Sequence, residues 1–311
     1  MRPSAQRKQV TPRTVLLTGG TGFVGSRVAR RLITLGHEVR AIVRTPRETP
    51  DLQHPSAQEI VGDFVDPAVA REAAEGCDLV IHCAATGGPD LDPVRRVNSE
   101  GTRSMVDAAL GAGATRFIHI STVSVYRTDD RPVIREESPL RTEGDPYGVT
   151  KAEGDRIILD AAGRGLQATI LRPGAILGVH PTSTWAVRVP ERIRDRQVKL
   201  RIDGRDTLPW VHIEDLVDAI LLAVVKDLSI GRVYNMVDGH TTWLEYTDRV
   251  RRWFGMAPLE ILPRGEVPKG AYWTGRFDAG RIRSELGYAP RRTFDGGMAE
   301  AGRYWRQVAA R

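Results

Sequence analysis

Six short apolar runs of strand length alternate with segments of helical spacing over the first 178 residues of the chain. These runs lie at 14–18, 39–43, 57–62, 78–85, 115–122 and 167–173. A succession of strands and helices in this order favours a parallel sheet with helices on both of its faces. The sequence therefore predicts an α/β fold built on a doubly wound parallel sheet.

Beyond Gly178 this alternation fades, although a strongly amphipathic helix is expected at 213–225 and a short strand after it. We expect a large unit and a smaller C-terminal α+β unit, with the chain crossing between them. The expected boundaries are a flexible tail at 1–12, a dinucleotide-binding unit at 13–178 with return segments near 211–237, and a substrate-binding unit made of 179–210 and 238–311.

Composition argues against several classes of protein. Hydrophobic residues make up 41% of the 311 positions, which is enough for a core. No apolar run approaches the ~20 residues that a membrane-spanning helix needs. The N-terminus lacks the apolar stretch of a secretion signal, and Cys77 and Cys83 are the only cysteines. We therefore expect a cytoplasmic protein without a disulfide framework or a membrane partner.

The net charge of +6 comes mainly from arginine, because only five of the 45 basic residues are lysine. Acidic residues are interleaved with the basic ones, and no block of like charge occurs. Nucleic-acid binding requires a clustered basic face. The expected partner is therefore a small-molecule substrate and no nucleic acid.

The stretch GGTGFVG, with glycines at Gly19, Gly22 and Gly25, directly follows the first strand and opens a helix. In this context one glycine permits a tight turn, another lets a pyrophosphate approach the backbone, and a third lets helix and strand pack closely. The free N–H groups of the helix N-terminus then face an anion. The stretch predicts a dinucleotide-binding loop.

The end of the second strand bears on which dinucleotide is bound. An acidic residue there would bind the ribose diol of NAD, but the strand ends at Arg44, with Arg40 and Arg47 nearby. A guanidinium would bind the 2′-phosphate of NADP, whereas a carboxylate would repel it. We therefore prefer NADP(H) and leave NAD(H) open. Asp63, after the third strand, is placed within reach of an adenine edge or serves as a helix cap.

Tyr147 and Lys151 lie four residues apart, on one face of an expected helix. A free phenol has a pKa of about 10, too high for ready proton exchange at neutral pH. We expect the neighbouring ammonium, and the positive nicotinamide when oxidised, to lower that pKa, so that Tyr147 can protonate a carbonyl oxygen or accept an alcohol proton. Lys151 could also hold the nicotinamide ribose. Ser121, Thr122 and Ser124 follow the fifth strand, at the carboxyl edge of the sheet where ligands bind.

This ordered set of motifs resembles the extended short-chain dehydrogenase/reductase family over nearly the whole chain after about residue 13. The motifs are GGTGFVG, HCAA, VNSEGT, STVSVY, YGVTK, LRPGAILG, PWVHIEDL and RVYNMVDG. The resemblance implies a Rossmann domain with a small substrate domain, and a catalytic triad of Ser or Thr, Tyr and Lys. Tyr147 and Lys151 carry over directly, and the spacing before Tyr126 selects Thr122, with Ser121 in reserve because Arg127 stands where the family usually has glycine.

The resemblance also assigns residues around the cofactor. Asn98 matches the family's Asn near the nicotinamide, and Pro173 and Gly174 match a segment whose backbone flanks that ring. Catalytic residues are expected at Thr122, Tyr147 and Lys151. The remaining cofactor-binding positions are expected at Gly19, Thr21, Gly22, Phe23, Val24, Gly25, Arg44, Asp63, Phe64, Ala84 and Ala85.

Two features favour the reductase branch of the family, which resembles dihydroflavonol reductases and 3β-hydroxysteroid dehydrogenases. The second strand is of the NADP type, and Leu208 lies where many sugar-nucleotide enzymes carry a diphosphate-binding Arg, although Arg188, Arg201 or Arg205 could substitute. We expect a carbonyl reductase or alcohol dehydrogenase acting on a medium-sized, largely apolar substrate. Substrate contacts are expected from Thr86, Ser124, His180, Trp185 and Trp210.

Two other functions remain open. One is an NAD-dependent epimerase or dehydratase of nucleotide sugars, and the other is a dinucleotide-sensing protein without chemistry, which would not need Thr122, Tyr147 and Lys151. No His, Cys, Asp or Glu cluster has metal-ligand spacing, so no metal is expected. Members of the family are often dimers built on a helix bundle, and a homodimer is possible here.

Overall fold

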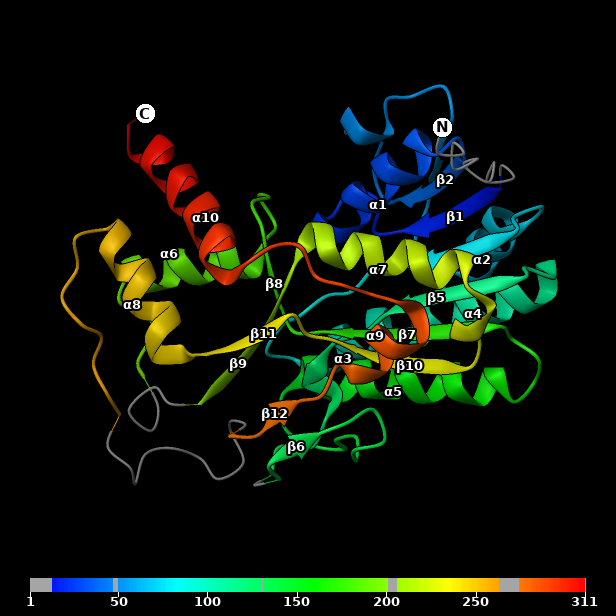
Figure 1. The fold of residues 1–311 in the computed structure, drawn as a ribbon. Helices are drawn as coiled ribbons and strands as arrows, with labels where there is room; N and C mark the ends of the chain where they lie inside the picture. Colours follow the sequence, from blue (N-terminus) through cyan, green and yellow to red (C-terminus); the bar gives the residue numbers. More distant parts are fainter. Residues whose placement is uncertain (1–12, 47–49, 130, 201–205, 263–273, 311) are drawn as a thin grey trace, which may run out of the picture.

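A seven-stranded parallel sheet forms the centre of the larger part of the molecule (Figure 1). The computed structural model describes residues 13–46, 50–129, 131–200, 206–262 and 274–310. The strands stand in the order β10-β7-β5-β4-β1-β2-β3. Their bounds are β1 Thr14–Thr18, β2 Glu38–Val43, β3 Ala57–Val61, β4 Leu79–His82, β5 Arg116–Ile120, β7 Ala168–Pro173 and β10 Arg232–Met236.

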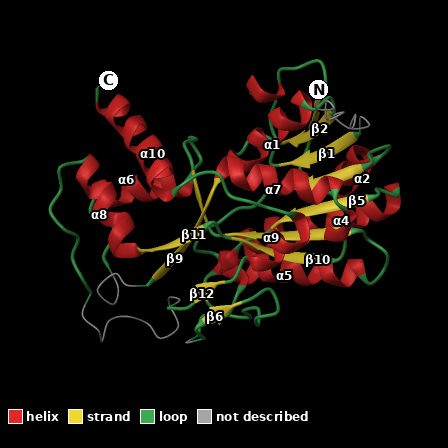
Figure 2. Ribbon diagram, viewed as in Figure 1, coloured by secondary structure: helices red, strands yellow, loops and turns green. Residues whose placement is uncertain are grey.

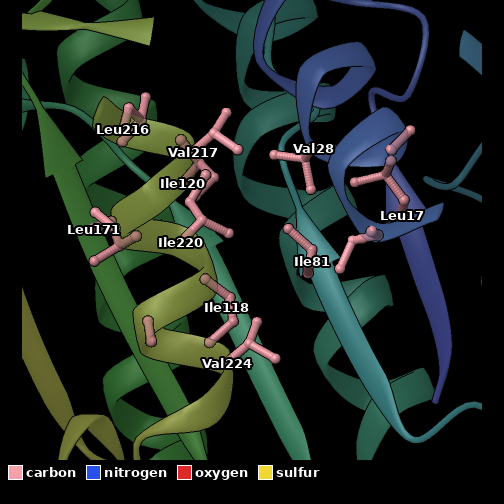
Figure 3. Packing of buried hydrophobic residues seen from close by; sticks show 14 of the residues in the cluster. Leu17, Val28, Ile81, Ile118, Ile120, Leu171, Leu216, Val217, Ile220 and Val224 are labelled. Carbon is pink, nitrogen blue, oxygen red and sulfur yellow. The ribbon is translucent and has the colours of Figure 1, made fainter. Parts of the chain in front are cut away.

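Helices cover both faces of this sheet, because its central strands are apolar on both sides. On one face, α1 (Phe23–Thr34) and α7 (Ile213–Val225) enclose a core that also includes Ile282 and Leu286 of α9 (Gly280–Leu286). Figure 3 shows the side chains of α1 and α7 meeting those of β1, β4, β5 and β7 in this core. On the other face lie α2 (Pro67–Ala74), α4 (Gly101–Ala112) and α5 (Pro146–Ala162).

A three-stranded sheet lies in the smaller part of the molecule, at one end of the large sheet (Figure 2). Its order is β11-β9-β8, with β8 parallel to β9 and β11 antiparallel to it. Three helices pack with it around a core rich in aromatic residues. The bounds are β8 Ala175–Leu177, β9 Thr207–His212, β11 Gly239–Thr242, α6 Val189–Arg194, α8 Trp243–Trp253 and α10 Phe294–Ala309.

Shorter elements complete the described chain. β6 (Val133–Ile134) pairs with β12 (Arg276–Phe277), and α3 (Leu91–Arg95) precedes a π-helical turn, η2 (Arg96–Glu100). The other short turns are η1 Pro50–Leu52, η3 Val123–Val125, η4 Thr184–Arg188 and η6 Asp227–Ser229.

The structure confirms the α/β fold, its parallel sheet, and the helix expected at 213–225, which is α7. α3, η2 and α4 follow one another without a break, so residues 91–112 form one helical run that contains a π-helical turn. β8 lies inside the segment 13–178 but belongs to the small sheet, while α9 lies beyond 238 and packs into the large core. The exact division into two units stays a prediction, and the tail at 1–12 lies outside the described residues.

No helix among the described residues is long and apolar enough to span a membrane.

Candidate active site

The glycine loop connects β1 to α1 at the carboxyl edge of the large sheet. Gly19 has a φ of 71°, a left-handed conformation that favours glycine, and the Gly22 amide donates to the Gly19 carbonyl at 2.9 Å. A Cβ on Gly25 would lie 2.6 Å from the Gly19 carbonyl carbon and 3.0 Å from the Gly20 Cα. Only glycine therefore allows α1 to begin this close to the turn.

The N-terminus of α1 is suited to an anion. Gly22 caps the helix without a side-chain hydrogen bond, and the first turn carries no acidic residue. The amides of Phe23 and Val24 belong to the first turn, which has no intrahelical partners for its N–H groups. These donors and the positive end of the helix dipole match a pyrophosphate, so the loop fits a dinucleotide. Thr21, also in the loop, is partly exposed.

Three residues expected at the adenosine end differ in their surroundings. Arg44 follows β2 and is exposed, whereas Arg40 donates to the carbonyls of Ala73 and Glu75, at 3.0 and 2.6 Å. Arg40 therefore binds the end of α2 and is not free for a phosphate. Asp63 accepts from the Val65 amide at 3.1 Å and forms an ion pair with Arg96 at 3.2 Å. Arg47 lies outside the described residues.

Tyr147 and Thr122 meet where α5 begins beside the η3 turn. The Asp145 side chain caps α5 by accepting from the Gly148 amide at 2.9 Å. A Cβ on Gly148 would lie 2.6 Å from the Ser124 carbonyl oxygen, so glycine lets the helix approach this turn. The Thr122 hydroxyl accepts from the Ser124 amide at 3.1 Å and hydrogen-bonds to Tyr147. The two expected catalytic groups are therefore in contact.

The expectation that the Lys151 ammonium lowers the pKa of Tyr147 is wrong for this structure. Burial raises the pKa of the Tyr147 phenol to about 12, and the hydrogen bond from Thr122 offsets only part of this effect. The Lys151 side chain points towards the end of β5, where Nζ donates to the Ile120 carbonyl at 2.8 Å and lies 3.3 Å from His119 Nε2. Burial lowers the pKa of Lys151 to about 8, while Asp155 opposes that shift.

Asn98 holds the loop after β4 against α5. It is fully buried in η2, where its Oδ1 accepts from the Thr86 amide at 2.9 Å. Its Nδ2 donates to the Thr86 carbonyl at 2.9 Å and to the Thr150 hydroxyl at 3.0 Å. Asn98 therefore ties the loop at Thr86 to Thr150 of α5, and its place near the nicotinamide stays a prediction.

The two tryptophans expected to contact substrate pack in the core of the smaller part of the molecule, and their contact with substrate stays a prediction. Trp210 is 8% exposed and contacts Phe294, and Trp185 lies between Trp243 and Tyr246. His180 stacks on the Phe23 ring, with centroids 5.7 Å apart, which brings it next to the glycine loop. Ser124 is partly exposed in η3.

The other expected residues surround the carboxyl edge of the sheet. The Ala84 amide donates to Thr18 Oγ1 at 3.2 Å, and Ala85 is exposed. Pro173 ends β7, and a Cβ on Gly174 would lie 2.6 Å from the Pro209 carbonyl oxygen, so Gly174 permits contact with β9. Phe64 packs edge-on against His82 at 5.5 Å.

A buried polar network behind Tyr147 was missed by the sequence analysis. His119, Asp155 and Arg172 are at most 1% exposed. Arg172 Nε donates to Asp155 at 2.8 Å, and Arg172 Nη1 donates to the Tyr126 hydroxyl at 2.8 Å. Two signals were available in the sequence. His119 in RFIHI and Arg172 in ATILRP are polar residues inside apolar strands, and Asp155 lies four residues after Lys151.

No group of three or more His, Cys, Asp or Glu side chains that could hold a metal ion occurs within the described ranges.

Residues 15–236 match the model of the NAD dependent epimerase/dehydratase family. The chain is 28% identical to a 4-hydroxy-2-methyl-3-oxo-4-farnesyl-3,4-dihydroquinoline-1-oxide ketoreductase of Stigmatella aurantiaca, over 91% of this chain and 93% of that protein. It is also 28% identical to a dTDP-glucose 4,6-dehydratase of Streptomyces griseus, over 92% of both chains.

Among solved structures, the dTDP-glucose 4,6-dehydratase DesIV of Streptomyces venezuelae, with NAD and TYD bound, superimposes with a TM-score of 0.82. The two are 25% identical, and the match covers 96% of this chain and 98% of the other. The fold is thus one that binds NAD in a similar protein.

Proposed function

The chain belongs to the NAD dependent epimerase/dehydratase family, and from this premise we propose that it is an NADP(H)-dependent carbonyl reductase or alcohol dehydrogenase. As a member of this family it is an NAD(P)-dependent enzyme of the extended short-chain dehydrogenase/reductase type. The proposed substrate is a medium-sized, largely apolar ketone, aldehyde or alcohol. The contact between Thr122 and Tyr147, one helical turn from Lys151, is the observation that carries the proposal.

Tyr147 acts as the acid in the proposed reduction. The nicotinamide, when bound, supplies the hydride that adds to the carbonyl carbon. The Tyr147 phenol gives its proton to the carbonyl oxygen, and the O–H bond of the product alcohol forms as the phenol O–H bond breaks. Thr122 hydrogen-bonds to Tyr147 and stabilises the phenolate that remains until solvent returns a proton.

Lys151 and the glycine loop hold the cofactor in this proposal. The Phe23 and Val24 amides bind the pyrophosphate. Lys151 has two protein acceptors for its three N–H donors, so its third donor is available to the nicotinamide ribose. Asn98 positions the loop that carries Thr86 on the substrate side. The smaller unit, including the segment around His180, covers the substrate.

The η3 turn favours reduction over dehydration. Elimination of water requires a base for a C–H proton and an acid for the departing hydroxyl, in addition to the hydride-transfer groups. The residues that follow Thr122 in this turn are Val123 and Ser124, neither of which carries a carboxylate. A reductase needs only the acid Tyr147. The similarity to a ketoreductase of a farnesyl-bearing quinoline supports a largely apolar substrate.

The preference for NADP(H) is part of the same proposal and rests on Arg44. This side chain is exposed directly after β2, where its guanidinium can bind a 2′-phosphate.

Replacing Tyr147 by Phe tests the proposed acid. We expect kcat for NADPH-dependent reduction of a panel of aliphatic and aromatic ketones to fall by at least ~10²-fold, because a positioned acid contributes that much or more. NADPH affinity should change little. Tyr304→Phe, on α10, is the matched control and should keep full turnover. Equal turnover of Tyr147→Phe and the native enzyme would remove the assignment.

Epimerisation or dehydration of a nucleotide sugar is the second candidate, because the dehydratase of Streptomyces griseus covers nearly the whole chain. Arg188 is exposed in η4, while Arg201 and Arg205 lie outside the described residues. Purified protein that carries bound NAD and converts a nucleotide sugar, but reduces none of the carbonyl panel, would favour this candidate.

A further inference from the structure

A buried chain of polar groups connects Lys151 to the interior of the large sheet. His119 in β5 is fully buried, and its Nε2 lies 3.3 Å from Lys151 Nζ and 3.7 Å from Asp155 Oδ1. Lys151 and Asp155 are one turn apart on α5 and are 1% and 0% exposed. The proposed mechanism uses Lys151 but gives His119 no role.

His119 can serve Lys151 only as an acceptor. An ammonium carries three donors and no acceptor, so the His119 Nε2 that faces it must be unprotonated. Burial, and the positive charge of Lys151 next to it, lower the pKa of His119 well below its usual range, which keeps the ring neutral. The ring also stacks on His82, with centroids 5.4 Å apart, and this contact fixes its plane.

We propose that His119 is a positioning residue of the active site, whose neutral imidazole accepts a hydrogen bond from the Lys151 ammonium and holds that charged amine at the sheet edge. Together with the Ile120 carbonyl it fixes two of the three Nζ donors, which leaves the third for the cofactor. The contact between His119 and Lys151 does not depend on the proposed function, but the expected effect on turnover rests on that function.

The groups around Lys151 set the sign of the pH effect. Asp155 favours the charged amine, and it is itself paired with Arg172. Tyr147 lies one turn before Lys151 on α5. The titratable groups that face the amine from the neighbouring elements are His119 of β5, His82 of β4 and Cys83 directly after β4.

The lowered pKa of Lys151, about 8 in the folded protein, gives a readout that needs no substrate. The unfolded chain binds the lysine proton up to a pH of about 10.4, so folding stability rises with pH between about 8 and 10.4. Loss of the His119 acceptor disfavours the charged amine more than the neutral one, because a hydrogen bond from a charged donor is the stronger. The resulting loss of stability should therefore be largest below pH 7 and should shrink above pH 9.

The test compares His119→Phe, which keeps a ring against His82 but no acceptor, with His119→Gln, whose side-chain oxygen can replace Nε2. Thermal unfolding is measured from pH 6 to 10 in the native and Lys151→Met backgrounds. We expect His119→Phe to melt below His119→Gln at pH 6, the gap to close towards pH 10, and the gap to vanish with Lys151→Met. The pH at which kcat/KM begins to decline on the alkaline side should fall by about one unit in His119→Phe. It should not change in His119→Gln.

A gap that is independent of pH and survives Lys151→Met would overturn the proposal and leave His119 a packing residue. His82→Phe is the matched control, because His82 bonds Thr18 and Thr102 but not Lys151. His82→Phe should lower the melting temperature relative to the native protein by the same amount at pH 6 and at pH 10. A pH-dependent gap that vanishes with Lys151→Met supports the role of His119 even if no substrate is turned over, and in that case only the proposed function fails.

Discussion

Gly25→Ala should separate cofactor binding from folding. The added Cβ would lie 2.6 Å from the Gly19 carbonyl carbon and closer still to its oxygen, where ordinary contact begins at 3.4 Å. The carbonyl carbon alone requires loop and helix to separate by about 0.8 Å, and the oxygen requires more; overpacking of this kind costs roughly 1–3 kcal/mol. Alanine recovers up to about 1 kcal/mol of helix propensity. The net loss of stability is then roughly 0–2 kcal/mol.

Cofactor binding should suffer more than stability, because the displaced Gly19 turn and the first turn of α1 form the pyrophosphate site. A misplacement near 1 Å can cost about 10²-fold, and we expect the Kd for NADPH to rise by about that factor. Titration calorimetry measures the Kd, and circular dichroism measures the melting temperature. Gly111→Ala is the control: it lies in α4 with no atom within 4 Å of the added Cβ, so binding should stay native. An unchanged Kd in Gly25→Ala would refute the assignment of the loop.

Two further predictions concern charge. Arg44→Asp should raise the Kd for NADPH by at least about tenfold while changing that for NADH much less, since only NADPH loses a charge-assisted bond to phosphate; Arg103→Asp on α4 matches the change in net charge, and equal losses for both cofactors would exclude a 2′-phosphate contact. In the native enzyme, kcat/KM for reduction should decline as the pH rises through about 8, because Lys151 loses its proton there, whereas Tyr147, with a pKa near 12, stays protonated; a profile that is flat from pH 6 to 10 would show that the amine's charge is not needed.

The backbone of the site follows from local sequence because its causes are local. The glycine spacing at 19–25 requires a turn between β1 and α1, and the pattern at 213–225 specifies α7 from end to end. Periodicity did not indicate the π-helical turn η2 or the hydrogen bonds that Asn98 forms there with the Thr86 backbone, because these bonds join residues twelve positions apart.

The electrostatics of the site could not be predicted from the sequence, because they depend on contacts between residues far apart in the chain. Whether a lysine four residues from a tyrosine shifts its pKa depends on where the amine points. Here α5 directs Lys151 towards His119 and Ile120, so burial dominates the pKa of Tyr147 and leaves the phenol a weaker acid than expected. That orientation is set by residues of β5, which lie about thirty positions away along the chain.

A raised pKa at Tyr147 is compatible with its role as the acid in reduction. A phenol that stays protonated up to a pH of about 12 always carries the proton that the carbonyl oxygen needs. The reverse reaction requires the phenolate, which Thr122 alone stabilises only weakly against burial.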